Sequence, residues 1–126
     1  MADKPSFVLD AFALLAYLND EPGAARVEQV LVQAGKGKCR LLASIINLGE
    51  LLYIIERRGG PSKAQDALAL IQQLPIDVLP ADEQAVFEAA HIKAARALSY
   101  ADAFAAAAAI RENAVILFTS PDPPRL

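Results

Sequence analysis

The chain has 126 residues, a hydrophobic share of 55%, a mean hydropathy of +0.30 and a formal net charge of −3. This length suits one domain, expected over residues 1–126, and this hydrophobic share excludes a disordered chain. The net negative charge excludes a protein that attracts nucleic acid through its overall field, although bound cations can reverse the sign locally. No apolar stretch approaches the ~20 residues of a membrane helix and no secretory signal opens the chain, so we expect a cytoplasmic protein with no membrane partner.

Short β-type runs alternate with helical patterns along the whole chain. In order, the predicted elements are a strand at 6–9, helices at 11–18 and 24–33, a strand at 40–43, helices from Ser44 to about 58 and at 62–74, a strand at 76–79, helices at 81–98 and from 99 to about 113, and a strand at 115–118. Alternating strands and helices imply a parallel sheet that is covered on both faces. The predicted fold is therefore α/β, with three α/β/α layers and a short, mostly parallel sheet.

Four carboxylates stand next to apolar runs, at positions where a structural residue would be apolar or neutral. They are Asp10, Glu50, Asp102 and Asp122. Burying a carboxylate is unfavourable unless a cation or several hydrogen-bond donors compensate it. In a parallel sheet, functional residues gather at the carboxyl ends of the strands, so four acids that converge there would form an oxygen-ligand site for Mg²⁺ or Mn²⁺.

Three of these acids also have simpler explanations. Asp10 precedes a helix and can cap its first turn. Asp102 lies three residues after Ser99, a spacing close to that of a capping box. Asp122 stands between two prolines, where aspartate is common in turns. A capping role and a ligand role are compatible, because a cap also sets the direction of the side chain.

Glu50 is harder to explain as a structural residue. Ser44, Asn47 and Glu50 form the only polar side of the first three turns of an otherwise apolar helix. A charged group there is either paired, with Arg57 as the candidate partner, or functional.

Other kinds of catalytic site find little support in the sequence. His91 is the only histidine and Cys39 the only cysteine, so the usual Cys and His ligands of a zinc site are lacking. Ser44 and Ser99 have no plausible histidine partner for a Ser–His–Asp triad and are better explained as helix caps. We therefore interpret His91 as a structural or surface residue.

Four segments together resemble PIN-domain proteins. They are residues 7–18 (FVLDAFALLAYL), 44–51 (SIINLGEL), 98–104 (LSYADAF) and 116–119 (ILFT), in the order in which that family carries its acidic motifs. Among small prokaryotic members, the chain is most similar to the VapC-type toxins of toxin–antitoxin pairs. The resemblance implies a Mg²⁺- or Mn²⁺-dependent ribonuclease that forms homodimers and is neutralised by an antitoxin.

On this resemblance, Asp10, Glu50 and Asp102 would hold the metal and Asp122 would be an outer ligand. Asn47, Thr119 and Ser44 would support these ligands by hydrogen bonding. Two rival functions stay open at this stage. One is a PIN-like binding or regulatory protein that has lost catalysis, and the other is a small-molecule hydrolase that uses the same carboxylates.

The chain departs from the family pattern in two places. Ala11 and Phe12 follow Asp10, where the family commonly has a hydroxyl residue. Pro121 stands where the family usually has its last aspartate, which displaces the acid to Asp122. These departures concern catalytic competence more than the fold.

Overall fold

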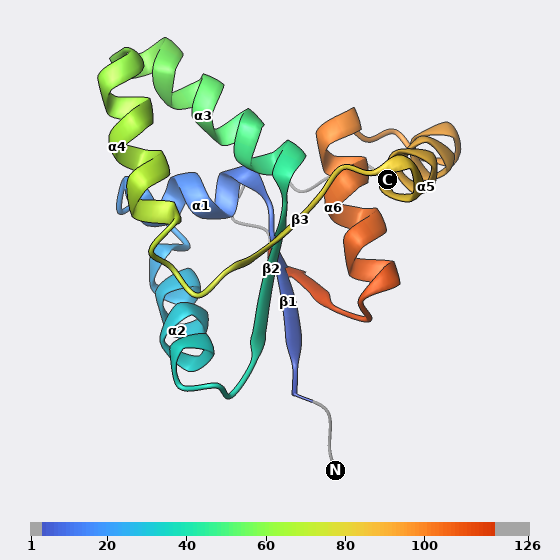
Figure 1. Cartoon of the computed structure of the whole chain (residues 1–126), viewed down its shortest axis with the longest axis horizontal. Helices are drawn as coiled ribbons and strands as arrows, with labels where there is room; N and C mark the ends of the chain where they lie inside the picture. The colour runs from blue at the N-terminus through green and yellow to red at the C-terminus, as the bar shows by residue number, and fades with distance from the viewer. Residues whose placement is uncertain (1–3, 118–126) are drawn as a thin grey trace.

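A four-stranded sheet with every strand parallel forms the centre of the molecule, in the order β3-β2-β1-β4 (Figure 1). The computed structural model describes residues 4–117. The strands are β1 (Ser6–Leu9), β2 (Arg40–Ser44), β3 (Asp77–Leu79) and β4 (Val115–Leu117). The predicted α/β fold with a short parallel sheet is confirmed.

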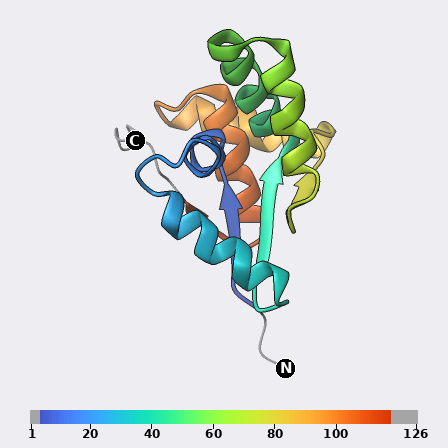
Figure 2. The ribbon, with the colours of Figure 1, turned by 90° about the vertical axis from the view of Figure 1, so that its left-hand side faces the viewer.

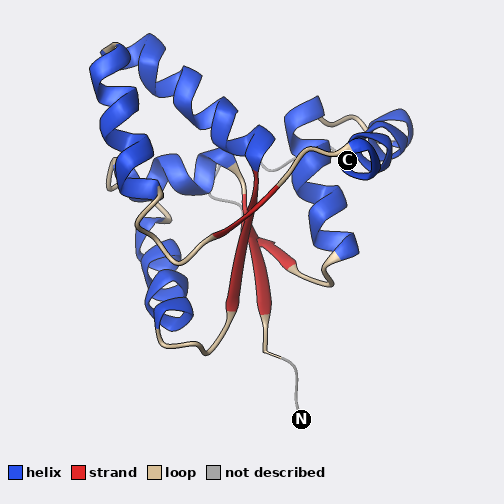
Figure 3. Cartoon of the chain, in the orientation of Figure 1, coloured by secondary structure: helices blue, strands red, loops and turns tan. Residues whose placement is uncertain are grey.

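Six helices cover the sheet in the described part of the chain (Figure 3). They are α1 (Ala11–Leu18), α2 (Ala24–Gly35), α3 (Ile45–Gly59), α4 (Pro61–Ile71), α5 (Glu83–Ala95) and α6 (Tyr100–Arg111). In Figure 2, α2 (cyan to blue) crosses in front of the lower parts of β1 and β2, α3 and α4 (green) lie above the strand ends, and α6 (orange) lies behind the strands. None of the helices within residues 4–117 combines the length and the apolar character that crossing a bilayer requires.

The alternation of side chains along the strands explains the two helical layers. Val8 and Leu42 point to one face of the sheet and pack against Ala105 and Ala108 of α6. Their neighbours on the strands point to the other face, where they join a larger core with residues of α1, α2 and α3; these neighbours are Leu9, Leu41 and Ala43. Full burial of each leucine stabilises the fold by about 1.5–3 kcal/mol.

Helix α6 is narrow because its buried face is made almost entirely of alanine. Its buried alanines are Ala103, Ala105, Ala107, Ala108 and Ala109. Such small side chains let α6 approach the sheet on one side and α5 on the other, where Phe104 packs among Ala85 and Ala89. The position of α6 sets the position of Asp102 in its first turn.

Three helices are shorter than the sequence pattern predicts, and one of them, α6, spans Tyr100–Arg111 where residues 99 to about 113 were expected. Helix α5 was expected from residue 81 but begins at Glu83, because the Asp82 side chain caps it by accepting a hydrogen bond from the Ala85 amide at 2.9 Å. It ends at Ala95, since Arg96 is extended. Helix α4 ends at Ile71, three residues before the expected end.

A sharp turn joins α3 to α4. Gly60 has a φ of 91°, a conformation that favours glycine, and Pro61 occupies the first helical position of α4. Each predicted strand is present, and the predicted helix starts at residues 11, 24 and 45 coincide with those observed.

Candidate metal centre

Asp10 lies directly after β1, at the carboxyl end of the sheet. The chain continues from β1 to β2 on one side, while β4 pairs with β1 on the other, so Asp10 stands at the point where the strand order reverses. Ligands of open α/β sheets bind at such points. The Asp10 residue is only 2% exposed, and its Oδ1 accepts a hydrogen bond from the Ala13 amide at 2.8 Å. The cap expected from the sequence is therefore present, but it is buried.

Burial raises the pKa of the Asp10 carboxyl from its ordinary value of 3.8 to about 6. Loss of hydration is the main cause, because water no longer stabilises the charged form. The hydrogen bond from Ala13 opposes the rise, and the negative charge of Asp102 adds to it. Asp102 therefore lies close enough to Asp10 to influence it electrostatically, although 92 positions separate them in the sequence.

Glu50 lies half-buried on α3 and has no counter-ion within residues 4–117. Burial raises the pKa of its carboxyl, with further contributions from the charges of Asp102 and Asp10, while the neighbouring Asn47 side chain lowers it. Its Oε1 is buried and has no hydrogen-bond partner among the described residues. The Arg57 guanidinium lies 5.4 Å from the centre of the Tyr53 ring and forms no ion pair with Glu50. Pairing with Arg57, one of the two explanations from the sequence, is wrong.

Asp102 is in the first turn of α6, and its backbone amide donates to Ser99 Oγ at 3.0 Å. Ser99 thus caps α6 as the spacing predicts. The reciprocal bond of a capping box, in which the Ser99 backbone amide would donate to the Asp102 carboxylate, is absent in the described part of the structure. The carboxylate is therefore available for another partner.

Ser44 and Asn47 lie at the start of α3, the helix that carries Glu50. Ser44 ends β2 and caps α3, accepting from the Ile46 amide at 3.2 Å. Asn47 is completely buried, and its Nδ2 donates to the carbonyl oxygen of Ala101 at 3.0 Å. Asn47 thus joins the helix of Glu50 to the helix of Asp102. The sequence signal for this residue was its polar character in an apolar helix turn.

The structure therefore brings three of the four predicted acids, Asp10, Glu50 and Asp102, to one region. Asp122 and Thr119 lie outside the described residues. Within residues 4–117, no three Asp, Glu, His or Cys side chains are close enough together to hold a metal ion as they stand. Like charges repel, so drawing three carboxylates together requires a cation. These side chains fit a hard divalent cation, because all of them offer oxygen ligands and Glu50 Oε1 has no hydrogen-bond partner within residues 4–117.

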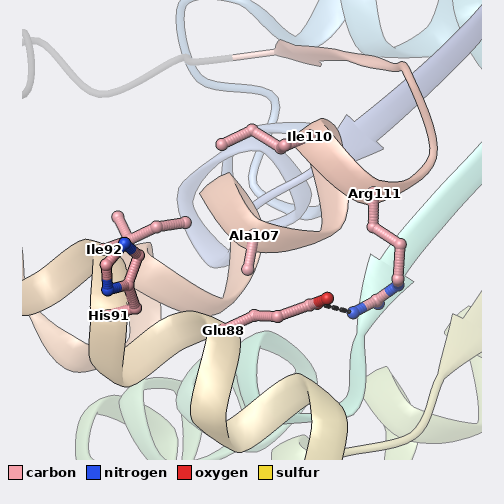
Figure 4. A pocket seen from close by; sticks show the side chains of 6 residues that line it. All are labelled: Glu88, His91, Ile92, Ala107, Ile110 and Arg111. Atoms are coloured by element: carbon pink, nitrogen blue, oxygen red, sulfur yellow. Dashed lines mark hydrogen bonds and ion pairs between the residues drawn. The ribbon is translucent and has the colours of Figure 1, made fainter.

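A separate hollow between α5 and α6 contains none of these acids. Figure 4 shows the residues that line it: Glu88, His91, Ile92, Ala107, Ile110 and Arg111. An ion pair between Arg111 and Glu88 closes one side. His91 is exposed there, as the sequence analysis expected.

Comparison with solved structures gives close matches of fold at low identity. VapBC2 from Rickettsia felis, bound to a DNA fragment from its promoter, has a TM-score of 0.71 at 17% identity, covering 91% of this chain and 88% of that one. DNA-bound VapBC from Salmonella typhimurium has a TM-score of 0.67 at 24% identity, covering 89% of this chain and 84% of that one. VapC20 of Mycobacterium tuberculosis, a toxin that cleaves the Sarcin-Ricin loop, has a TM-score of 0.65 at 18% identity, covering 86% and 84%.

Comparison with curated proteins gives no match. The PIN domain family model matches residues 7–122, which is nearly the whole chain and includes all four predicted acids. The family resemblance noted in the sequence is therefore confirmed, and this chain belongs to the PIN domain family.

Proposed function

We propose that this protein is a Mg²⁺- or Mn²⁺-dependent endoribonuclease that acts as the toxin of a toxin–antitoxin pair. The observation that carries the proposal is that the charge of Asp102 raises the pKa of both Asp10 and Glu50, so the three acids lie near one another at the carboxyl end of the sheet. Membership of the PIN domain family and similarity in fold to VapC structures support it.

In this proposal the three carboxylates hold the cation, and α3 and α6 present Glu50 and Asp102 to it. A bound divalent cation lowers the pKa of an attacking water and neutralises charge on the phosphate. No side-chain nucleophile is needed, which agrees with the lack of a histidine or cysteine near the acids. Ser44 and Asn47 keep the first turns of α3 in place behind Glu50.

Exposed aromatic side chains near the acids favour RNA over a small-molecule substrate. Within residues 4–117, three of the four exposed aromatic residues lie within three positions of Asp10, Glu50 or Asp102: Phe12, Tyr53 and Tyr100. Tyr53 is one helical turn from Glu50, and the Arg57 guanidinium lies over its ring. Aromatic rings and stacked guanidinium groups bind unstacked bases of single-stranded RNA.

The proposal predicts that the protein cleaves single-stranded RNA only in the presence of a divalent cation. Cleavage of a fluorescently labelled RNA is measured with Mn²⁺, with Mg²⁺ and with EDTA. We expect EDTA to abolish cleavage and added Mn²⁺ to restore it. Cleavage that persists in EDTA, or no cleavage of any tested RNA with either metal, would contradict the proposal; the second result favours the binding or regulatory alternative.

In the same assay we expect Asp122→Asn to reduce cleavage less than Asp10→Asn. Pro121 offers neither a carboxylate nor a backbone N–H, and the displaced acid is expected to support the cation indirectly. Equal losses in both variants across a Mn²⁺ titration would make Asp122 a direct ligand.

Two partners belong to the proposal: a second copy of the chain and a cognate antitoxin. An antitoxin Arg or Lys placed among the acids would replace the charge of the cation. The helices between Ser44 and Leu74 carry more Leu and Ile than one small domain needs, which predicts a dimer surface on them. The most exposed large apolar side chains within residues 4–117 lie elsewhere, namely Phe87, Ile110 and Val115.

Sedimentation is expected to show a dimer. A strict monomer at high concentration would contradict the proposed homodimer.

A further inference from the structure

Asn47 has one amide atom paired and one unpaired, although the residue is completely buried. Nδ2 donates to the Ala101 carbonyl at 3.0 Å, and Oδ1 has no hydrogen-bond partner among the described residues. A carbonyl can only accept, so this contact determines which amide atom faces Ala101. An unsatisfied buried acceptor is unfavourable, and native proteins seldom keep one without a purpose.

The surroundings of Asn47 indicate what Oδ1 serves. Asn47 precedes Glu50 by three residues on α3, so the two side chains lie on the same helix face. Its partner Ala101 immediately precedes Asp102 on α6. The amide therefore lies between the two helices that carry Glu50 and Asp102. Its neighbour Glu50 also has a buried oxygen, Oε1, without a partner. Two adjacent side chains thus each offer an unused oxygen.

The unused oxygens of Asn47 and Glu50, near the carboxylates of Asp10 and Asp102, call for a cationic or hydrogen-bond-donating ligand. Neither Arg57 nor any other Lys or Arg within residues 4–117 forms an ion pair with Glu50. A hydrated divalent cation provides both positive charge and water O–H donors.

We propose that Asn47 is a positioning residue of the cation site, holding α6 through Nδ2 so that Asp102 faces Glu50 and offering Oδ1 to the hydrated cation as an acceptor. This inference deepens the proposed function and rests on it. It also provides one more oxygen acceptor in a chain whose sequence has Pro121 instead of the usual last acid of the family. Partners behind metal ligands of this kind typically change metal affinity by about 10–100-fold.

The test measures Mn²⁺ affinity of the whole chain, with free Mn²⁺ followed by electron paramagnetic resonance, and the rise in melting temperature that Mn²⁺ causes. The variants are Asn47→Ala and Asn47→Leu. Leucine has a shape close to that of asparagine and leaves no cavity, so Asn47→Leu is the variant that is expected to keep the fold if Asn47→Ala does not. Asp82→Ala serves as the control because it removes the cap of α5 and lowers stability without changing Asp10, Asn47, Glu50 or Asp102.

We expect both Asn47 variants to bind Mn²⁺ about 10–100-fold more weakly and to lose most of the Mn²⁺-induced rise in melting temperature. Asp82→Ala should melt earlier with and without Mn²⁺ and keep the affinity of the unmodified chain. A merely structural Asn47 would behave like Asp82→Ala, and that result would overturn the inference.

Asp10→Asn separates the two proposals. One possible result is that the unmodified chain binds Mn²⁺ and Asp10→Asn does not, while both Asn47 variants have a Mn²⁺ affinity within twofold of the unmodified chain. In that case only the role of Asn47 is wrong. If the unmodified chain does not bind Mn²⁺, the proposed function and this inference fall together.

Discussion

Asp10→Asn is expected to reduce RNA cleavage by more than about 100-fold in kcat/KM, since even the loss of a partner behind a metal ligand reduces activity by about 10–100-fold. Asparagine caps helices as well as aspartate does, so the hydrogen bond from Ala13 to the side chain of residue 10 is kept. The substitution therefore removes the negative charge and one oxygen ligand while α1 stays in place. Cleavage of a labelled single-stranded RNA in Mn²⁺ measures the effect, and circular dichroism checks the fold.

Asp82→Asn is a matched control for this experiment. Asp82 caps α5 as Asp10 caps α1, with its Oδ1 accepting from the amide three residues ahead. Asp82 is exposed and lies outside the proposed site. We expect the Asp82→Asn variant to cleave RNA with the same kcat/KM as the unmodified chain. If Asp10→Asn keeps full activity, the metal-dependent nuclease mechanism proposed above is wrong.

The same Asp10→Asn substitution is expected to stabilise the metal-free protein at neutral pH. The folded-state pKa of Asp10 is about 6, above its ordinary value of 3.8, so the folded state binds the proton more tightly than the unfolded state does. Below pH 3.8 both states are protonated. Between pH 3.8 and 6 the free energy of unfolding falls as pH rises, by about 1.4 kcal/mol per pH unit. Above pH 6 it stays below its value at pH 3.8.

At pH 7.5 in EDTA, Asp10→Asn should therefore raise the free energy of unfolding by on the order of 3 kcal/mol. The gain should fade as the pH is lowered toward 4. Removing the charge of Asp10 also relieves Glu50, whose pKa is raised partly by that charge, so both effects have the same sign. Urea unfolding from pH 4 to pH 8 measures the difference between the two proteins.

Mn²⁺ should reverse this order of stability. A cation that binds only the folded state stabilises the unmodified chain, and Asp10→Asn should gain little from it. Asp82→Asn should change the free energy of unfolding by no more than about 0.5 kcal/mol at any pH, as exposed substitutions usually do. An Asp10→Asn variant that is no more stable than the unmodified chain at pH 7.5 in EDTA would show that the carboxylate is not strained by burial.

Several features of this protein could be predicted from the sequence because they depend on neighbours in the chain. The caps at Asp10, Ser44 and Ser99 were expected, since each bonds an amide only two or three residues ahead. The strands and the alternation of strands with helices followed from apolar periodicity, and the parallel sheet followed from that alternation. The cap at Asp82 had the same local signal and was overlooked.

Other features were decided only by the tertiary structure, because they depend on residues far apart in the chain. The strand order β3-β2-β1-β4 places Asp10 where the order reverses, and the burial that raises its pKa comes from elements on both sides of the sheet. Arg57 had two possible partners at helical spacing, Glu50 and Tyr53, and only the packing of side chains selected Tyr53. The bond from Asn47 to Ala101 spans 54 positions. Periodicity along a chain reports which face of its own element a residue occupies, whereas the partner across that face is determined by how the elements pack.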